Sequence, residues 1–459
     1  MRFNAIRARL CLLGIFLSLL PRCGFGQTLA PTPPMGWNSW DSYGTTINEA
    51  KFRASAAWVA THLKASGYEY VTIDEAWFDA DPPADGSKKD DKRFLDSNGR
   101  YIPAPDRYPS SAGGFGFGPL AEYVHSLGLK FGIHVLQGIP KEAVAENLPI
   151  SGSTAHARDA ANLAGGCVWN PDNYDVSVSE AGQAYYDSIV EQYSSWGVDF
   201  IKIDCIASRP YKGDEIRMFH RAIERARRPM VLSLSPGEAP LDEAMNLQRY
   251  SQMWRISDDM WDLWHSDKSY PQGVNDQFPR AAKWIAAQQP GHWPDADMLP
   301  LGRLGPAPGW GKPRDSSLTH DEQRTMMNLW CIMRSPLMYG GDPAATDEWT
   351  LSLLTNREVL AVDQHSRNNR SVTLTDALAV WTAEPEKMGG RYVAVFNRKD
   401  VAQDIDLAWK DLAIPVGRHA VRDLWSQKDE ADRTSLRLTL SAHASALVWV
   451  ADSTRFLPR

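Results

Sequence analysis

The sequence predicts a parallel (β/α)8 barrel over residues 27–365, followed by an antiparallel β-sandwich domain over residues 366–459. Eight apolar, β-branched runs alternate with helical patterns in the first region, which is typical of a barrel with long loops. From about Asn368 the pattern changes to short alternating runs separated by turn residues, which is typical of a sandwich. A doubly wound open sheet is the alternative, but no glycine-rich phosphate loop follows the first run.

The expected barrel strands are short runs in which hydrophobic residues dominate. They are Met35–Trp40, Tyr70–Asp74, Lys130–Leu136, Val198–Asp204, Met230–Leu234, Met253–Ser257, Trp293–Met298 and Pro336–Tyr339.

Two of the intervening helices have clear boundaries. In Asn48–Ser66 the apolar residues recur at helical spacing, and Gly67 marks the C-terminal end. Thr319–Arg334 opens with Thr319 and Glu322 at the spacing of a capping box.

The C-terminal domain is expected to consist almost entirely of strands. Its only helical signal lies at Asp406–Leu412. The predicted strands are Ala377–Thr382, Tyr392–Phe396, Arg418–Leu424, Leu436–Leu440 and Ser445–Val450.

The first 26 residues read as a secretory signal peptide, which predicts a secreted or periplasmic protein. Three arginines precede the apolar run Leu10–Leu20, which is too short for a membrane span. Removal of this segment changes the net charge from −7 to −11, because it takes away four arginines and no acids. Such an acidic chain without a basic cluster argues against nucleic acid and membrane partners.

The cysteines and aromatic residues indicate which disulfide, metal site and ligand class to expect. Cys331 lies in an apolar helical run and is expected to be a buried thiol, which leaves Cys167 and Cys205 as candidates for one disulfide. No cysteine spacing fits a zinc site, so neither a metal nor a cofactor is predicted. The 18 tryptophans and 15 tyrosines suit either carbohydrate binding or core packing.

Period-two alternation selects polar residues that point into the barrel at the carboxyl ends of the strands, where barrel enzymes keep their sites. In VDFIKIDC, Lys202 and Asp204 share the inner face. In MWRISDD, Arg255 alternates with Asp259, which favours Asp259 over Asp258 as the inward acid.

Two further strands add acids to the same mouth. Asp295 and Asp297 share a face of WPDADML, and Asp74 continues the inner face of Tyr70 and Thr72. Glu75 can join Asp74 only if the chain has already turned out of the strand.

Several carboxylates, together with Lys202 and Arg255, therefore converge on one mouth. Any single acid could equally be a helix cap or a solvated loop residue. Paired acids without metal ligands or a phosphate loop favour glycoside hydrolysis, in which one carboxylate attacks the anomeric carbon and the other protonates the leaving oxygen. Lys202 would keep Asp204 ionised.

At these residues the chain resembles glycoside hydrolase family 27, the melibiase group. The resemblance implies secreted, retaining exo-α-galactosidases built from a (β/α)8 barrel and a C-terminal β-sandwich. It rests on PPMGWNSWDSYG (33–44), GYEYVTIDEAW (67–77), LKFGIHV (129–135), WGVDFIKIDC (196–205), WRISDD (254–259), WPDADML (293–299) and LWCIMRSPLMYGGD (329–342).

The resemblance also implies a role for each site residue. Asp204 takes the place of the nucleophile, and Asp259 that of the acid/base. Trp37 would form a platform under the sugar ring, and a Cys167–Cys205 disulfide is implied beside the nucleophile. The residues that would bind sugar hydroxyls or line the pocket are Asp74, Glu75, Lys202, Arg255 and Asp297.

The chain departs from the family pattern in three places. Glu75 replaces a usual aspartate and reaches about 1.5 Å further toward the space of the galactose hydroxymethyl group. His134 replaces a common tyrosine, and Ser235 opens Ser-Pro-Gly in place of Cys-Glu-Trp, which offers a contact to the 2-hydroxyl. Finally, the long segment Gln137–Asp175, which carries Trp169 and Asn170, would either cap the pocket or only pack over the barrel.

The expected activity is retaining exo-hydrolysis of terminal α-D-galactosyl residues of a carbohydrate substrate. The alternative is a β-L-arabinopyranosidase of the same family, because β-L-arabinopyranose is the same ring without the hydroxymethyl group and Glu75 crowds that position. A more distant alternative is a sugar-binding protein without catalysis. The sequence leaves the oligomeric state open.

Overall fold

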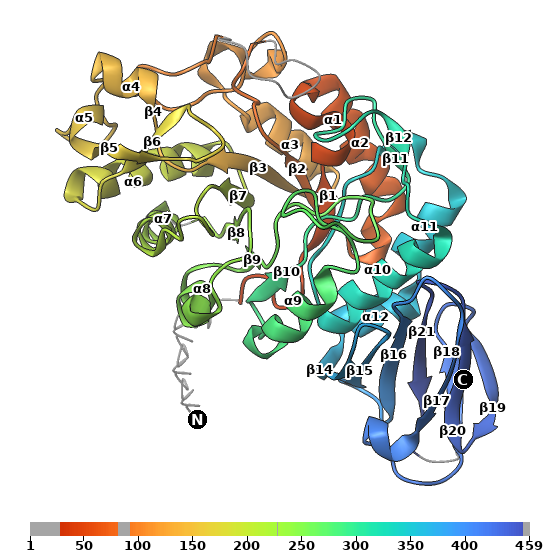
Figure 1. Ribbon diagram of the computed structural model, residues 1–459. Coiled ribbons are helices and arrows are strands. Elements are labelled where there is room, and N and C mark those ends of the chain that lie inside the picture. The colour runs from red at the N-terminus through yellow and green to blue at the C-terminus, as the bar shows by residue number, and fades with distance from the viewer. Residues whose placement is uncertain (1–27, 81–91, 227, 453–459) are drawn as a thin grey trace, which may run out of the picture.

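The computed structural model describes residues 28–80, 92–226 and 228–452, and the expected signal peptide at residues 1–26 lies outside them. Eight parallel strands form one curled sheet, in the order β10-β9-β8-β7-β3-β2-β1-β13 (Figure 1). The strands are β1 (Met35–Asn38), β2 (Tyr70–Ile73), β3 (Lys130–Leu136), β7 (Phe200–Asp204), β8 (Val231–Leu234), β9 (Met253–Arg255), β10 (Trp293–Asp295) and β13 (Leu337–Tyr339).

The two edge strands of this sheet meet and close a barrel. Just beyond β10, the Leu299 N–H donates to the Met338 carbonyl of β13 at 2.7 Å, and Leu299 forms a parallel bridge with Tyr339. The predicted (β/α)8 barrel is confirmed, and each of its strands overlaps one of the expected runs.

The barrel interior is filled by large side chains, each from a different strand. They form one buried cluster that includes Tyr70, Phe200, Val231, Met253, Trp293 and Met338. Because alternate residues of a strand face the same way, residues two and four positions after these point into the barrel mouth. This face carries Lys202 and Asp204 on β7 and Arg255 on β9.

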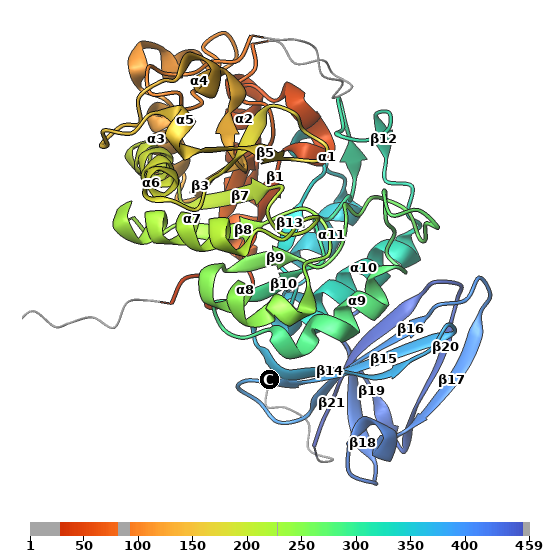
Figure 2. The same ribbon diagram turned by 60° about the vertical axis from the view of Figure 1, so that its left-hand side comes forward.

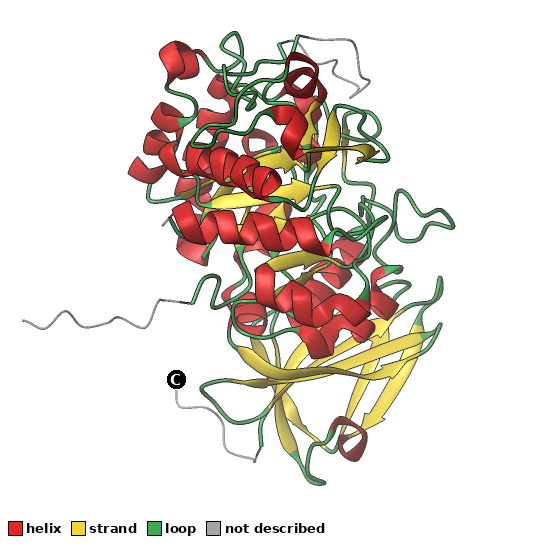
Figure 3. Ribbon diagram, turned by 90° about the vertical axis from the view of Figure 1, so that its left-hand side faces the viewer, coloured by secondary structure: helices red, strands yellow, loops and turns green. Residues whose placement is uncertain are grey.

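The outer helices surround the strands, as Figure 3 shows in red and yellow. On α2 (Glu49–His62), the Asn48 side chain accepts the Lys51 N–H at 3.0 Å, and α10 (His320–Met333) opens with the expected capping box of Thr319 and Glu322. No helix in the described ranges is long and apolar enough to cross a membrane. The other helices are α1 (Trp40–Tyr43), α3 (Gly118–Ser126), α6 (Glu180–Ser195), α7 (Gly213–Ala226), α8 (Ala244–Tyr250), α9 (Gln277–Trp284), α11 (Glu348–Thr355) and α12 (Arg357–Gln364).

The long connection between β3 and β7 folds into a small unit of its own ahead of α6. It holds the three-stranded sheet β4-β6-β5, which lies on the side of the barrel away from the C-terminal domain (Figures 1 and 2). Its elements are β4 (Ile139–Pro140), α4 (Lys141–Glu146), α5 (Ala157–Ala160), β5 (Ala161–Gly166) and β6 (Asn173–Val176).

A disulfide between Cys167 and Cys205 ties this unit to the end of β7, with their Cα atoms 5.5 Å apart. The implied pairing is confirmed, and Cys331 on α10 is a buried free thiol, as expected.

Replacing both bridged cysteines with serine should lower the free energy of unfolding by about 4 kcal/mol, because the bridge closes a loop with a sequence separation of 38 residues. Urea unfolding with and without reductant measures the effect. Reduction should destabilise the wild type to the level of the double variant and leave the variant unchanged. A wild type insensitive to reductant would contradict the prediction.

The C-terminal domain consists of a six-stranded antiparallel sheet, in the order β14-β15-β16-β21-β18-β19, and a two-stranded sheet of β17 and β20. A separate core, to which Val380, Val395 and Ile405 belong, connects them, so the predicted sandwich is confirmed. The strands are β14 (Ser366–Leu374), β15 (Leu378–Pro385), β16 (Arg391–Asn397), β17 (Gln403–Ala408), β18 (His419–Asp423), β19 (Lys428–Arg433), β20 (Ser435–Leu440) and β21 (Ser445–Val450).

The expectations for this domain were wrong in two respects. The helical signal at Asp406–Leu412 is split, because its first half belongs to β17 and only Trp409–Leu412 forms a 3-10 turn. Three strands, β14, β17 and β19, lie where no strand was expected.

The other face of the large sheet packs against the barrel helices (Figure 2). Phe278 of α9 meets Phe396 of β16 edge to face, with ring centroids 5.0 Å apart. The Asn328 amide of α10 donates to the Ser445 hydroxyl of β21 at 2.8 Å. The two domains therefore share one continuous core.

Candidate active site

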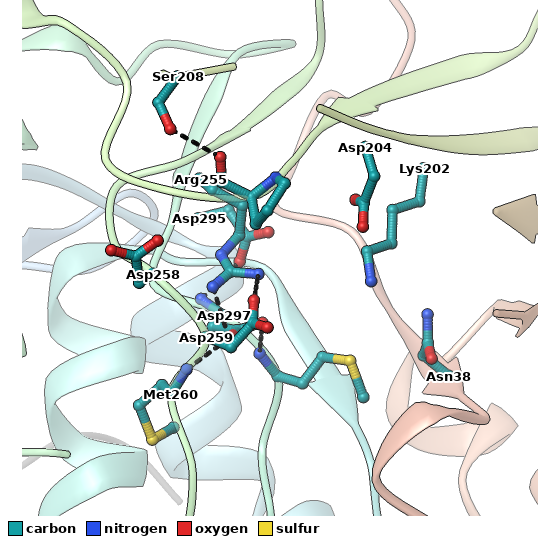
Figure 4. A network of polar contacts seen from close by, with 12 residues as sticks. Asn38, Lys202, Asp204, Ser208, Arg255, Asp258, Asp259, Met260, Asp295 and Asp297 are labelled. Atoms are coloured by element: carbon teal, nitrogen blue, oxygen red, sulfur yellow. Dashed lines mark hydrogen bonds and ion pairs between the residues drawn. The ribbon is translucent and has the colours of Figure 1, made fainter. Parts of the chain in front are cut away.

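Charged residues from different strands meet at the carboxyl end of the barrel. In Figure 4, Lys202 and Asp204 lie on one side, and Arg255, Asp259 and Asp297 lie on the other. These are the residues for which alternation predicted a common mouth, and the structure brings them together there.

Asp204 is the last residue of β7 and is held as an anion. Its Oδ2 lies 3.1 Å from Nε2 of His134, which comes from the neighbouring strand β3. Burial alone would raise the pKa of Asp204, but Lys202, His134 and the Ser235 hydroxyl outweigh burial and hold it well below the usual range. A buried, ionised carboxylate is suited to attack an electrophilic carbon.

His134 takes the position that the family pattern gives to a tyrosine, and it is fully buried. Burial lowers the pKa of His134, but the adjacent Asp204 carboxylate outweighs burial and raises it above the ordinary value. His134 is therefore more readily protonated than an ordinary histidine, and its ring faces the anionic carboxylate. Ser235 follows β8 and is also buried, on the side of the same carboxylate.

Lys202 links the inner faces of three strands. Its Nζ donates to Oδ2 of Asp74 at 2.9 Å, and the Asn38 amide donates to the same oxygen at 2.7 Å. Burial alone would raise the pKa of Asp74, but Lys202 and His134 outweigh burial and lower it. This arrangement presents fixed acceptors and a fixed cation to sugar hydroxyls.

Glu75 joins Asp74 because the chain has left the strand. β2 ends at Ile73, and Ala76 adopts a left-handed φ of 64°. The Glu75 N–H donates to Oδ1 of Asp74 at 2.9 Å, while Oε1 of Glu75 accepts from the Asn170 amide at 3.1 Å. The long segment Gln137–Asp175 therefore contacts the site rather than only packing over the barrel.

On the opposite side, Arg255 holds two acids. Its Nη1 lies 3.2 Å from Oδ1 of Asp259, and its Nη2 lies 2.6 Å from Oδ2 of Asp297. Burial raises the pKa of Asp259. Arg255 and Lys202 oppose this rise without cancelling it, and the negative charges of Asp204 and Asp258 add to it. Asp259 is thus disposed to carry a proton, as a general acid must.

Asp297 is the other acid on Arg255. Burial raises its pKa to about 7, with repulsion from Asp259 and Asp295 adding to the effect and Arg255 opposing it. The Met260 N–H donates to Oδ2 of Asp297 at 2.8 Å, which fixes the loop that carries Asp259.

Asp258 faces a different partner from its neighbour Asp259. Its Oδ2 accepts from Nη1 of Arg209 at 3.0 Å, and its other oxygen contacts Nη2 of the same guanidinium. The choice of Asp259 over Asp258 as the inward acid agrees with this geometry.

Trp37 does not reach the site, and its expected role as a sugar platform was wrong. Its ring is 0% exposed, packs edge-on against Tyr43 and tilted against Phe52, and donates through Nε1 to the Gly341 carbonyl at 2.9 Å. The reason is that Trp37 shares the outer face of β1 with Met35, whereas Asn38 faces inward.

Trp40 is the better candidate for the platform. It follows β1, is half-buried, and packs against the barrel-interior cluster. The Asn38 side chain accepts the Trp40 N–H at 2.8 Å while it binds Asp74, so the indole is placed relative to the site. Gly309 lies against this ring so closely that a Cβ there would be 2.1 Å from it.

Sequence reasoning also missed Asn38, Asp41 and Tyr270. Asn38 could have been found, because it alternates with Gly36 on the inner face of β1. Burial raises the pKa of Asp41, and Asp297 raises it further. The pKa of Tyr270 is likewise raised by burial and then by Asp259 and Asp297. Asp41 and Tyr270 lie outside the strands, where the alternation of residues cannot predict which way a side chain points.

Comparison with protein families agrees with this geometry. The family model described as "Alpha galactosidase A" matches residues 32–153 and 176–365, and the model described as "Alpha galactosidase C-terminal beta sandwich domain" matches residues 375–450. The chain belongs to glycoside hydrolase family 27. It is therefore a glycosidase, for which a carbohydrate substrate is expected. Residues 154–175 fall outside the family 27 match, and they include Cys167, Trp169 and Asn170.

Curated relatives within the family carry α-galactosidase names. Alpha-galactosidase A of Cellvibrio japonicus is 26% identical over 439 residues, which cover 91% of each chain. An alpha-galactosidase of Cyamopsis tetragonoloba is 29% identical over 415 residues, which cover 89% of this chain and 82% of the relative.

Similar solved structures include a family 27 β-L-arabinopyranosidase from Geobacillus stearothermophilus. It is 44% identical, with a TM-score of 0.87, and the match covers 92% of this chain and 97% of that one. A variant of that enzyme in complex with arabinose matches with the same identity and TM-score, over 92% and 98% of the chains.

Proposed function

We propose that the protein is a retaining exo-β-L-arabinopyranosidase. The observation that carries this proposal is Glu75, whose carboxylate extends one methylene beyond that of an aspartate and is held by Asn170. In the family pattern this position lies beside the space of the galactose hydroxymethyl group, which arabinopyranose lacks. The 44% identity to a family 27 β-L-arabinopyranosidase supports the same substrate.

In this proposal Asp204 attacks the anomeric carbon and forms a covalent glycosyl-enzyme, while Asp259 protonates the glycosidic oxygen as the bond breaks. Asp259 then takes a proton from water, whose oxygen attacks the same carbon and releases Asp204. Two inversions give net retention. The opposite pKa shifts of the two acids support these roles, because one must be ionised and the other protonated.

The second candidate is an α-D-galactosidase, which is favoured by the family description and the names of the curated relatives. Asp74, Lys202 and Arg255 would bind ring hydroxyls that both sugars share. The difference between the two activities therefore rests on whether the site accepts the hydroxymethyl group.

Hydrolysis of two p-nitrophenyl glycosides tests the choice. We expect kcat/KM on the β-L-arabinopyranoside to exceed that on the α-D-galactopyranoside by roughly 10- to 200-fold, the range available from excluding one small group. Proton NMR should show that the first-formed product has the same anomeric configuration as the substrate. Preference for the galactoside would favour the second candidate, and absence of turnover on both would support a non-catalytic sugar-binding protein instead.

We also propose that residues 1–26 direct export to the periplasm or the medium. The Cys167–Cys205 disulfide supports this, because structural disulfides persist in oxidising compartments. Mass analysis of the protein from its native cells should show a chain that begins near residue 27. A chain that retains residue 1 would contradict export by cleavage.

A further inference from the structure

We propose that Asn170 is a specificity-determining residue, which fixes the Glu75 carboxylate where the hydroxymethyl group of a galactoside would lie. This inference rests on the proposed function, since it names the device by which the same site would select its sugar. It concerns a residue outside the part of the chain that matches the family model.

Both ends of the Asn170 amide are engaged. Its Oδ1 accepts the Asp172 N–H at 3.0 Å, and its Nδ2 donates to Oε1 of Glu75 at 3.1 Å. A backbone N–H can only donate, so the amide oxygen must face Asp172 and the NH2 group must face Glu75. The side chain is 2% exposed, so little water competes for this contact.

The turn that carries Asn170 is anchored at its following residues. Asp172 pairs with Arg93 at 2.7 Å. The Asn173 amide donates to the Leu136 carbonyl at 3.3 Å, and its Oδ1 accepts from the Tyr101 hydroxyl at 2.8 Å. Asn170 is thus fixed relative to the end of β3 and cannot follow Glu75 if that side chain rotates.

The preceding residues are anchored as well. The disulfide joins Cys167, three positions before Asn170, to Cys205, which follows Asp204 directly. The amide donor is therefore held from both sides, by β3 after it and, before it, by the end of β7, which carries the proposed nucleophile.

This anchoring matters because a long carboxylate alone discriminates poorly. A glutamate has three side-chain torsions and can rotate away from a larger substrate at small cost. When a buried amide donates to the carboxylate, rotation breaks a charge-assisted hydrogen bond and leaves the amide donor without that partner. The longer side chain supplies reach, and Asn170 supplies rigidity.

The variant Asn170→Asp separates this role from a structural one. It keeps the acceptor for the Asp172 N–H and replaces only the donor that faces Glu75. We expect the ratio of kcat/KM for p-nitrophenyl β-L-arabinopyranoside to that for the α-D-galactopyranoside to fall about tenfold. A smaller ratio without a matching fall in melting temperature supports the inference.

Asn162→Asp is the matched control. Asn162 lies on β5 of the same segment, is exposed, and accepts the Ala164 N–H in the same kind of turn, at 3.2 Å. Asn162→Asp makes the same change of charge at a position that does not face Glu75. The ratio of kcat/KM values of this variant should therefore equal that of the wild type. Equal ratios in Asn170→Asp and Asn162→Asp would overturn the inference.

A double-mutant cycle with Glu75→Asp gives the decisive readout. The shorter carboxylate withdraws by about 1.5 Å and loses the amide, so adding Asn170→Asp should change the ratio less than about twofold. Additive effects of the two changes, or an equal loss on both glycosides with an unchanged ratio, would overturn the inference. If the wild type prefers the galactoside, the proposed function is refuted but the inference about Asn170 is not. The coupling between Asn170 and Glu75 would still be measured from the ratio of the two kcat/KM values.

Discussion

Replacing Asp204 with alanine is expected to lower kcat by roughly 10⁴- to 10⁶-fold, the scale on which loss of a nucleophile acts. Lys202 and His134 hold the carboxylate at this position as an anion, and alanine removes it altogether. Azide should partly restore turnover, and the product should be a glycosyl azide of inverted configuration, because azide would enter from the face that Asp204 leaves open. Steady-state kinetics and proton NMR measure both effects.

A change elsewhere on the surface serves as the control. Asp214→Ala removes an exposed carboxylate at the start of α7, next to Arg217, and should leave kcat within about twofold of the wild type. An Asp204→Ala variant that retains one hundredth of the wild-type rate, or forms a retained azide, would exclude Asp204 as the nucleophile.

Replacing Asp259 with alanine should lower kcat/KM by roughly 10²- to 10⁴-fold on glycosides with a poor leaving group and much less on activated ones. Protonation matters only where the leaving oxygen is basic. Azide should here give a product of retained configuration, because it attacks the glycosyl-enzyme in place of activated water.

The pH profile tests the same role of Asp259. Because burial and the nearby acids raise its pKa, Asp259 keeps its proton up to a higher pH than an ordinary aspartic acid does. Activity should fall as the pH rises through that pKa, and this alkaline limb should be missing in Asp259→Ala.

Asp258→Ala is the matched comparison for Asp259→Ala. Asp258 contributes a negative charge that raises the pKa of Asp259, so its removal should move the alkaline limb to lower pH and leave kcat within a few-fold of the wild type. Equal losses in the two variants would contradict the assignment of Asp259 as the acid/base.

The barrel could be predicted from the sequence because its strands are buried on both faces and read as continuous apolar runs. The missed strands lack this signal for physical reasons. β19, with the sequence KDEADR, is an edge strand that pairs with β18 through its backbone, and β14 is a polar edge strand on the other side of the same sheet. In β17 polar and apolar residues alternate, but the strand leads directly into the 3-10 turn that begins at Trp409. The end of the strand and the turn together therefore resemble one helical pattern.

Within the site, alternation located the residues that still belong to strands, such as Lys202 and Asp204. Alternation also selected Asp259, although β9 ends at Arg255. Glu75 and Asn170 lie beyond the strand ends, where only the folded chain sets the direction of a side chain. The Trp37 assignment failed for a different reason. It was carried over from the resemblance without the alternation test, which places Trp37 with Met35 on the outside of the barrel.

The insertion between β3 and β7 has an evolutionary consequence. In the proposed mechanism, bond cleavage depends on acids at or just beyond the ends of barrel strands, whereas the amide that donates to Glu75 belongs to a unit tied to β7 by a disulfide. If Asn170 sets the preference as proposed, natural variation in that unit would change which sugar is accepted while the cleavage chemistry stays intact, and grafting the unit onto a related barrel would exchange one preference for another.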